Sequence, residues 1–412
     1  MTKANTVTDD GTSRQPQPMQ GIRVLDIATF LAAPFTGTIL ADFGAEVIKI
    51  EQPDTGDPLR KFGTPTECGD TLIWLSEARN KRFATIDLRV PQGRDLFLKL
   101  VEQSDVILEN FRPGTMEKWG LGFDVLRSVN PRIVLLRVSA YGQTGPYRER
   151  PGFARVAHGF SGLAELAGMA DGPPVVPGST SLADYISGMW GAIGVLLTLR
   201  TVEQSGIGQV IDVSLYESVF RLLDELAPAY AKFGHVRTRM GADVAHVVPH
   251  GHWQTREGKW VALACSSDKI FERLAILMEQ PEMALPDRYA TNPQRLAGRG
   301  EINATIARWI GEHSLKDVIA RCDGAGVPCG PVMGIDDIFS DPQYAARGDL
   351  VKVNDARVGE IVVPVAVPML SDTPAVLRHL GGALGADTDT ILRTLLGLDP
   401  DAITMLREQR AI

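Results

Sequence analysis

Short apolar runs alternate with mixed segments through the first half of the chain. An apolar run at residues 22–27 is followed by a segment, residues 34–41, that a proline opens and Gly44 closes, and then by a second apolar run at residues 45–51. This order predicts a strand, a helix and a second strand. The alternation continues, with predicted strands at residues 83–88, 105–108, 132–138 and 209–213 and helices at residues 93–103, 116–129 and 214–233. Because strands that alternate with helices form parallel sheets covered on both faces, the pattern predicts an α/β fold with ligand sites beyond the carboxyl ends of the strands.

A long apolar helix is predicted at residues 182–202, with Ser181 and Asp184 at its start. Its apolar residues lie on all sides, which predicts burial over most of its surface; they are Met189, Trp190, Ile193, Val195, Leu196, Leu197 and Leu199. A serine followed three residues later by an acid is close to a capping box, in which both side chains accept from free amides at the helix start. The same position favours the ionised carboxylate that a nucleophile requires. The sequence pattern does not separate these two roles of Asp184.

The composition of the second half indicates a separate folding unit. Residues 233–248 are rich in Gly, Arg, His and Asp, which is typical of a linker, and a predicted hairpin and two predicted helices follow at residues 252–265, 269–278 and 302–311. Because 412 residues exceed the size at which one hydrophobic core stops growing, we expect a large α/β domain to be interrupted by a smaller α+β domain. The expected boundaries are residues 20–232 and 336–412 for the large domain and 233–335 for the small one, after a disordered tail at residues 1–19.

Charge and cysteine content exclude several classes of protein. The 42 Lys and Arg against 50 Asp and Glu give a net charge of -8, which disfavours binding to nucleic acids or to anionic membranes. The first 20 residues lack the apolar core of a signal peptide, and we find no apolar run that approaches the length of a membrane span. Four scattered cysteines without a Cys-x-x-Cys pair are too few for a disulfide framework. We therefore expect a protein of the reducing cytoplasm, without a membrane or nucleic-acid partner.

Polar and aromatic residues gather near the ends of two strands that the pattern predicts to be neighbours. They are Arg89, Asn110, Phe111, Arg112 and Lys118. Cations, an amide and an aromatic ring together suit a nucleotide with several phosphates, although each residue alone is also an ordinary solvated surface residue.

Other motifs narrow the choice of ligands. The loop at residues 28–34 links a strand end to a helix start and lacks Gly-x-Gly-x-x-Gly, so its small residues fit either a ligand or tight packing of the helix on the strand. Three histidines lack the spacing of a metal site; they are His246, His250 and His252. We expect no metal and no tightly bound cofactor.

Several motifs occur in a fixed order along the chain and resemble those of a known family. They are Gly21-Ile22-Arg23-Val24-Leu25-Asp26, Phe43-Gly44-Ala45-Glu46-Val47-Ile48-Lys49-Ile50-Glu51, Asn80-Lys81-Arg82, Glu109-Asn110-Phe111-Arg112-Pro113-Gly114, Gly142-Gln143-Thr144-Gly145-Pro146 and Gly326-Val327-Pro328-Cys329-Gly330-Pro331. From about Gly21 to the C-terminus the chain resembles the class III CoA-transferase family, of the formyl-CoA transferase and carnitine CoA-transferase type (CaiB/BaiF-like). The resemblance implies a Rossmann-like parallel sheet in the large domain and a homodimer of two interlocked chains.

The resemblance also implies a covalent mechanism in which Asp184 is the nucleophile. Asp184 would attack the thioester of an acyl-CoA to form a mixed anhydride, and the released CoA would return to give an aspartyl-CoA thioester. A carboxylic acid acceptor would then take the CoA through a second anhydride. The CoA contacts of the family map onto Ala32, Arg89, Asn110, Phe111, Arg112, Lys118 and Arg150. Coenzyme A thioesters would thus be substrates rather than resident cofactors.

Departures from the family pattern narrow the expected substrates. Leu31 stands where formyl-CoA transferases have a glutamine, and the glycine-rich loop of those enzymes is not visible at residues 246–253, which disfavours formate and oxalate. Residues 245–250 and 266–269 are similar to the succinyl-CoA:dicarboxylate branch. We therefore expect transfer from succinyl-CoA to a small dicarboxylate such as malate, mesaconate or citramalate. An acyl-CoA racemase or epimerase of the same fold is the alternative, although Phe153 stands where those enzymes carry a histidine.

Overall fold

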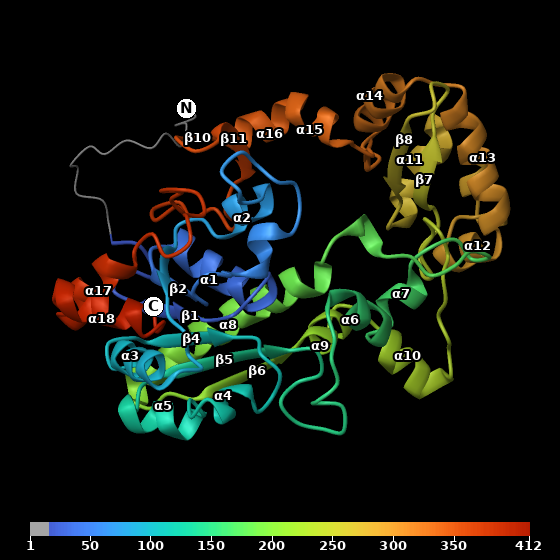
Figure 1. Cartoon of the computed structure of the whole chain (residues 1–412). Helices are drawn as coiled ribbons and strands as arrows, with labels where there is room; N and C mark the ends of the chain where they lie inside the picture. The colour runs from blue at the N-terminus through green and yellow to red at the C-terminus, as the bar shows by residue number, and fades with distance from the viewer. Residues whose placement is uncertain (1–15) are drawn as a thin grey trace. The chain divides into compact units, whose positions relative to one another are not determined.

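The computed structural model describes residues 16–412, which form two compact units (Figure 1). Unit 1 comprises the described residues up to Leu163, Val176–Asp224 and Gln343–Ile412, and unit 2 comprises Ala164–Val175 and Glu225–Pro342. Of the tail predicted at residues 1–19, residues 1–15 lie outside the described residues. Met19 is buried, and its amide donates to the carbonyl oxygen of Phe43 at 3.0 Å, so the folded chain starts before residue 20.

Unit 1 is built on a six-stranded parallel sheet, and the predicted α/β fold with a Rossmann-like sheet is confirmed. Its strands are β1 (Arg23–Asp26), β2 (Glu46–Glu51), β3 (Arg82–Thr85), β4 (Val106–Glu109), β5 (Val134–Ser139) and β6 (Val210–Ser214). They lie in the order β3-β2-β1-β4-β5-β6, and every adjacent pair is parallel. The order reverses between β1 and β4. In such sheets, the crevice beyond the carboxyl ends of the strands at this switch point is where ligands bind.

Helices cover both faces of this sheet (Figure 1). Val24 of β1 belongs to the core on one face and Leu25 to the core on the other, and both are fully buried. The first face is covered by α1 (Ala32–Asp42), α6 (Ala154–Phe160), α8 (Leu182–Ser205) and α9 (Leu215–Phe220). The second is covered by α3 (Pro91–Val101), α5 (Phe123–Val129), α17 (Thr388–Leu396) and α18 (Pro400–Glu408). Strands buried on both faces need apolar residues at successive positions, and each buried Leu or Ile contributes roughly 1.5–3 kcal/mol.

Two helices that the sequence predicts as continuous are broken. The predicted helix at residues 116–129 is split into α4 (Thr115–Lys118) and α5. Between them Gly120 has a φ of 73°, a left-handed conformation that few residues other than glycine adopt. The predicted helix at residues 214–233 is split into α9 and α10 (Leu226–Phe233), with Asp224 at a φ of 42° in the break. A left-handed residue ends a helix even where the apolar period continues.

The predicted long helix is confirmed as α8, but the expectation that most of its surface is buried is wrong. Its core face carries mainly small residues, because a Cβ at Gly191 would lie 2.4 Å from Thr36 Oγ1 of α1. The large apolar residues Met189, Ile193, Leu196 and Leu197 are exposed, whereas Val195 is buried. Close packing on α1 therefore leaves the large side chains outside.

The length of α8 also corrects the expectation that no apolar run approaches a membrane span. By length and composition, α8 is the one helix in residues 16–412 that is long and apolar enough to cross a membrane. Core helices of soluble proteins have the same property. One face of α8 packs on the sheet of unit 1, as the core residues Ala183, Val195 and Val202 demonstrate.

Unit 2 has its own antiparallel sheet and core. The predicted hairpin is confirmed as β7 (His250–Gln254) and β8 (Trp260–Ala264), and β9 (Cys329–Pro331) adds a third strand. Trp253, Phe271 and Ile306 are in the core between this sheet and α11 (Asp268–Leu277), α13 (Arg299–Gly311) and α14 (Leu315–Ala325). The other elements of the described chain are α2 (Leu72–Glu77), α7 (Leu163–Leu166), α12 (Asn292–Ala297), α15 (Ile335–Ser340), α16 (Pro342–Arg347), β10 (Leu350–Asp355) and β11 (Gly359–Pro364), with 3-10 turns at Pro58–Lys61, Pro177–Ser179 and Pro281–Ala284.

Candidate active site

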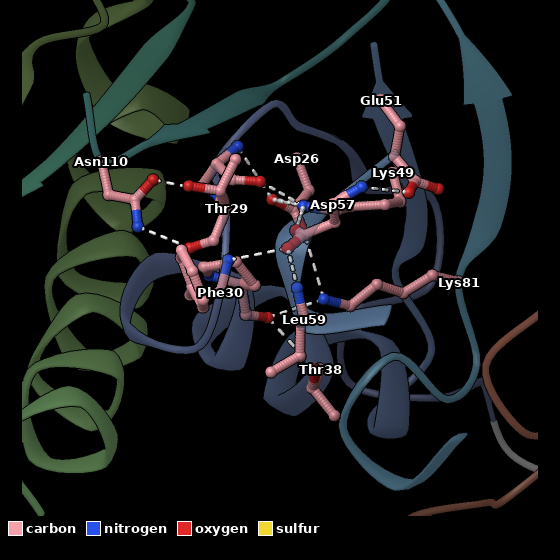
Figure 2. A network of polar contacts seen from close by, with 12 residues as sticks. Asp26, Thr29, Phe30, Thr38, Lys49, Glu51, Asp57, Leu59, Lys81 and Asn110 are labelled. Carbon is pink, nitrogen blue, oxygen red and sulfur yellow. Dashed lines mark hydrogen bonds and ion pairs between the residues drawn. The ribbon is translucent and has the colours of Figure 1, made fainter. Parts of the chain in front are cut away.

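Asn110, which follows β4, bridges the carboxyl ends of β1 and β4. Its Nδ2 donates to the carbonyl oxygen of Thr29 at 2.7 Å, and its Oδ1 accepts from the amide of Thr29 at 2.8 Å (Figure 2). Thr29 belongs to the loop between β1 and α1, 81 residues away in the chain. One side chain therefore satisfies both backbone groups of a loop residue and joins the two halves of the sheet at the switch point.

Phe30, the next residue of this loop, has a strained backbone. Its φ of 60° lies in the left-handed region, which costs a residue other than glycine on the order of 1–3 kcal/mol. The buried Asp57 holds this conformation, because its Oδ1 accepts from the amide of Phe30 at 3.0 Å and from the amide of Leu59 at 2.9 Å (Figure 2). The Phe30 ring contacts the rings of Phe62 and Phe153 edge to face, with centroids 6.1 Å and 6.0 Å apart. Strain of this kind persists only where the surroundings determine the conformation.

The buried Lys49 of β2 connects this loop to the sheet (Figure 2). Its Nζ pairs with Asp57 Oδ2 at 2.9 Å and with Asp26 Oδ1 at 3.6 Å, and it donates to the carbonyl oxygen of Ala28. Burial disfavours the charged form of Lys49, but the carboxylates of Asp26, Asp57 and Glu51 outweigh that effect and raise its pKa. Lys49 is thus a cation inside the protein.

A second buried cation, Lys81, holds the first turn of α1. Its Nζ pairs with Asp26 Oδ2 at 2.9 Å and donates to the carbonyl oxygen of Pro34 at 2.7 Å. Burial lowers the pKa of Lys81, and the charge of Asp26 opposes this shift. The start of the loop after β1 and the first turn of α1 are therefore both bound to side chains that are sequestered from water.

Asp184 lies in the first turn of α8, at the carboxyl edge of the sheet. α8 leads into β6 through a short turn, so its C-terminal end is at the amino edge and its N-terminal end is at the opposite edge. A Cβ at Gly194 would lie 2.9 Å from Ile211 of β6, which shows how closely α8 packs on the sheet. The ring of Tyr185 contacts the ring of Phe35 in α1, with centroids 4.9 Å apart. The first turns of α8 and α1 therefore lie side by side.

The carboxylate of Asp184 has no hydrogen-bond or ion-pair partner among the described residues. Ser181 at the N-cap makes no side-chain hydrogen bond to the helix, so the predicted capping box is not formed. Burial raises the pKa of Asp184 to about 7. The expectation that amides at the helix start keep this carboxylate ionised is therefore wrong for the unliganded chain, because desolvation favours the protonated form.

His158 of α6 caps α8 instead. Its Nε2 accepts from the amide of Ala183, next to Asp184, at 3.0 Å, and His158 is 1% exposed. Because an amide donates to Nε2, the ring is neutral and carries its proton on Nδ1, which has no partner among the described residues. Burial and the charge of Arg155 lower the pKa of His158, which favours this neutral form. This cap was not predictable from the sequence, because no local pattern connects residues 25 positions apart.

Five of the residues that the family resemblance assigns to CoA come from the elements that follow β1 and β4. They are Ala32, Asn110, Phe111, Arg112 and Lys118. The Phe111 ring contacts the ring of Trp119 edge to face, with centroids 4.9 Å apart, and so holds the loop after β4 against α4. Arg112 and Lys118 are exposed and make no side-chain hydrogen bond or ion pair with another described residue. Two free cations beside an aromatic pair suit the phosphates of a nucleotide.

The other two assigned residues lie elsewhere along the chain of unit 1. Arg89 follows β3, and β2 and β1 separate β3 from β4, so the expectation that these strands are neighbours is wrong. Three strand spacings correspond to roughly 14 Å. Arg89 is also bound to Asp87 through two hydrogen bonds of 2.8 Å and 2.6 Å. Arg150 lies in the loop after β5, with its guanidinium 3.6 Å from the centroid of the Tyr147 ring.

The histidines that the sequence raises as metal candidates lie in unit 2. His246 Nε2 pairs with Glu225 at 2.7 Å, and His250 and His252 lie two residues apart on β7. Within residues 16–412, no group of three or more His, Cys, Asp or Glu side chains is placed to hold a metal ion.

Known proteins resemble this chain along nearly its whole length. The model of CoA-transferase family III matches residues 19–388. The alpha subunit of the succinyl-CoA–L-malate CoA-transferase of Chloroflexus aurantiacus is 50% identical to this chain, over 99% of this chain and 96% of the subunit. The beta subunit of that enzyme is 51% identical, over 98% of this chain and 100% of the subunit. The crystal structure of a CaiB/BaiF family protein from Brucella suis matches with a TM-score of 0.81 at 31% identity, over 92% of this chain and 100% of that one. As the motifs of the sequence indicate, the chain belongs to CoA-transferase family III.

Proposed function

We propose that this CoA-transferase moves CoA from succinyl-CoA to malate or a closely related small dicarboxylate. The observation that carries the proposal is the identity of 50% and 51% to two subunits whose name states that reaction. Leu31 supports it, because this residue is buried in an apolar cluster with Leu59 and Trp74 and offers no polar group to formate or oxalate.

We infer that Asp184 is the nucleophile of the transfer. In its ionised form, the Asp184 carboxylate attacks the carbonyl carbon of succinyl-CoA, the carbon–sulfur bond breaks, and CoA leaves as the thiolate. The product is a mixed anhydride of Asp184 and succinate. The thiolate then attacks the aspartyl carbonyl carbon, which releases succinate and leaves an aspartyl-CoA thioester. The free carboxylate at the carboxyl edge of the sheet supports this role, because no described side chain competes for its oxygens.

The second half of the reaction runs the same steps in reverse order. The acceptor carboxylate attacks the aspartyl-CoA carbonyl carbon and expels CoA thiolate, which gives a second anhydride. The thiolate attacks the acceptor carbonyl of this anhydride, and Asp184 leaves as the free carboxylate. The energy of the thioester is conserved at every step, so transfer requires no ATP.

Arg112 and Lys118 are the side chains that we propose for the phosphates of CoA. Both are exposed cations without a described ion-pair partner, and they follow β4 at the switch point. Arg89 is a weaker candidate, because Asp87 already occupies its guanidinium through two hydrogen bonds. We assign Asn110 to the scaffold of the site, since both polar atoms of its amide are bound to Thr29.

The nucleophile is tested by replacing Asp184 with asparagine, which keeps the shape of the side chain but removes its negative charge. We expect the rate of transfer from succinyl-CoA to malate to fall about 10³-fold or more, because covalent catalysis is lost. Hydroxylamine added after succinyl-CoA should convert Asp184 of the wild-type protein to a hydroxamate that mass spectrometry locates. Asp124→Asn is the matched control, since Asp124 also lies in the first turn of a helix, α5, and is exposed.

Two results would contradict the proposed function. Full transfer by Asp184→Asn would remove Asp184 as the nucleophile, and failure of the wild-type protein to transfer CoA to any of a panel of dicarboxylates would remove the substrate class. A racemase would instead exchange the α-proton of an acyl-CoA for deuterium without an acceptor acid. Phe153, which stands where racemases carry a histidine, has no group that could exchange this proton.

We also propose that the chain works as a homodimer. The exposed residues Met189, Ile193, Leu196 and Leu197 form an apolar surface on α8, which we call the outer face of α8, and contiguous surfaces of this kind mark interfaces. The chain is as similar to the alpha subunit of the Chloroflexus enzyme as to the beta subunit. We therefore expect one type of chain to supply both members of the pair.

A further inference from the structure

We propose that Asp57 is a positioning residue of the active site, which acts by holding the loop between β1 and α1 in its strained conformation. Residues 28–34 comprise the loop after β1 and the first turn of α1, which lies against the first turn of α8, so the inference rests on the proposed role of Asp184. Asp57 is 2% exposed, and it therefore acts through Phe30 rather than on a substrate.

The backbone of Phe30 requires such a partner. With a φ of 60°, Phe30 has a conformation that an unsupported loop leaves for a more favourable one. The amide of Phe30 donates a hydrogen bond of 3.0 Å to Asp57 Oδ1, 27 residues away in the chain. Among the described residues, this is the hydrogen bond that the amide makes. Loss of that acceptor would free the loop at its most strained point.

Asp57 is itself held at two points, its carboxylate and its backbone amide (Figure 2). Its Oδ2 pairs with Lys49 Nζ at 2.9 Å, and its own amide donates to Glu51 Oε2 at 2.8 Å. Lys49 and Glu51 lie on the same strand, β2. The sheet therefore determines where Asp57 lies, and Asp57 determines where Phe30 lies.

Neighbouring residues of the loop are bound in the same manner. The amide and carbonyl of Thr29 are bound to Asn110, and the carbonyl oxygen of Ala28 accepts from Lys49 (Figure 2). Buried or half-buried backbone groups that lose such partners remain desolvated without a hydrogen bond, which destabilises that conformation. Residues 28–30 thus have one favourable conformation, and the side chains that select it come from other elements.

Asp70 provides a matched control, because among the described residues it is connected to Asp57 only through Arg60 and Glu51. Like Asp57, it is a buried carboxylate, and it pairs with Arg60 Nη1 at 2.9 Å. Arg60 in turn binds Glu51 at 2.7 Å. Asp70 makes no hydrogen bond or ion pair with residues 28–34 of the described chain, so its loss removes a buried charge without releasing the loop.

The test compares Asp57→Ala, Asp57→Asn and Asp70→Ala in the full chain. Three quantities are measured, namely kcat and KM for succinyl-CoA with malate, hydrogen exchange of the peptide that covers residues 28–34, and the temperature of unfolding. We expect Asp57→Ala to lower kcat/KM by about 10- to 100-fold and to speed exchange of the loop. Asp57→Asn keeps an oxygen that accepts from Phe30 but places a donor, Nδ2, against the Lys49 ammonium, so it should recover part of both losses and still unfold at a lower temperature than wild type.

Asp70→Ala should lower the unfolding temperature while kcat/KM stays within about threefold of wild type and exchange of residues 28–34 is unchanged. Equal changes in kinetics and exchange for Asp57→Ala and Asp70→Ala would overturn the proposal, as would wild-type kcat/KM and loop exchange in Asp57→Ala.

If Asp57→Ala does not fold, Phe30→Gly and Phe30→Ala form a second matched pair. Both remove the ring, but only glycine adopts a positive φ without strain. The alanine variant should therefore unfold at a lower temperature and have the lower kcat/KM, and identical behaviour of the two variants would overturn the proposal.

Hydrogen exchange in the unliganded protein does not depend on turnover. Absence of CoA transfer in the wild-type protein would therefore remove the proposed function, and the effect of Asp57→Ala on exchange at residues 28–34 would still decide whether Asp57 positions the loop.

Discussion

Asp184 combines a helix-start position with an environment that opposes its charge. The first turn of a helix usually stabilises a carboxylate, but Asp184 accepts no hydrogen bond from a described amide, and burial raises its pKa to about 7. A carboxylate without donors keeps its oxygen lone pairs free for attack on a thioester. The cost is that only part of the enzyme is ionised at neutral pH.

At the residue scale, this environment predicts a pH dependence of the reaction. Because Asp184 must be ionised to act as the proposed nucleophile, kcat/KM for succinyl-CoA should rise with pH and level off above the pKa of Asp184, about 7. Below that value, kcat/KM should fall about tenfold for each pH unit. Steady-state rates from pH 5 to pH 9 check this profile. A kcat/KM that is constant from pH 5 upward would mean that the carboxylate is already ionised there.

Thermal unfolding tests the raised pKa of Asp184 independently of catalysis. The folded-state pKa of Asp184 lies above its ordinary value of 3.8, so the folded chain holds a proton that the unfolded chain loses between pH 3.8 and about 7. The free energy of unfolding that depends on Asp184 is therefore highest below pH 3.8 and decreases through this window. Relative to wild type, Asp184→Asn should gain on the order of 1 kcal/mol between pH 5 and pH 8, since partial exposure screens part of the effect.

At the scale of elements, the start of α8 depends on α6. His158 accepts from the amide of Ala183, and Asp184 is the next residue of the helix. A cap of this kind orients the first turn as well as stabilising it. The position of Asp184 is therefore determined by a side chain of another helix and not by its own N-cap residue, Ser181.

Removing the acceptor of His158 should lower both the free energy of unfolding and kcat/KM. His158→Leu removes the acceptor and should cost about 1 kcal/mol in the free energy of unfolding, with a loss of about tenfold or more in kcat/KM because the first turn of α8 is released. His158→Gln keeps an acceptor near the position of Nε2 and should restore most of kcat/KM. Thermal unfolding and steady-state rates check both variants. Equal kcat/KM in the two would show that the hydrogen bond has no positioning role.

The cap should also respond to pH with a defined sign. The pKa of His158 is lowered from 6.5 by burial and by Arg155, so the neutral ring is favoured in the folded chain. Its contribution to stability is present above pH 6.5 and is lost as the pH falls through the lowered pKa, because a protonated ring no longer accepts from Ala183. His158→Gln should not show this loss.

At the scale of the molecule, the exposure of large apolar side chains on the outer face of α8 is not explained by the packing of a single chain. Leu197 is 67% exposed in the middle of an apolar helix, and Met189, Ile193 and Leu196 lie near it on the same helix. The core face has no room for them, since glycines there approach α1 and the sheet. A second copy of the chain would remove these side chains from water.

The assembly is tested by light scattering on the purified chain. We expect twice the mass of one chain, and Ile193→Asp with Leu197→Asp should reduce it towards the mass of one chain, because an interface would then have to bury two charges. Val125→Asp is the matched control, since Val125 is an exposed apolar residue on α5, which covers the other face of the sheet. A wild-type monomer with full activity would contradict the proposed homodimer.

Elements with a clear local period were predictable from the sequence. The apolar runs of β1, β2 and β5 identified strands, and the proline-opened segment after β1 identified α1. Breaks at left-handed residues were not predictable, as Gly120 and Asp224 illustrate. The outward direction of Leu197 was missed because α8 is apolar on every side, so its composition does not distinguish the core face from the outer one.

The sequence by itself determined the alternation of strands and helices, because this pattern depends on residues that are close together in the chain. The choice of Asp184 as the candidate nucleophile came from the family resemblance, which rests on the order of motifs from Gly21 to Pro331 and not on the residues around Asp184. Only the tertiary structure decided the order of the strands, which separates Arg89 from Asn110. It also decided which side chains hold the site, since Asp57 and His158 act across 27 and 25 residues. The raised pKa of Asp184 was also decided by the tertiary structure, because desolvation depends on what packs around a side chain and not on its neighbours in the sequence.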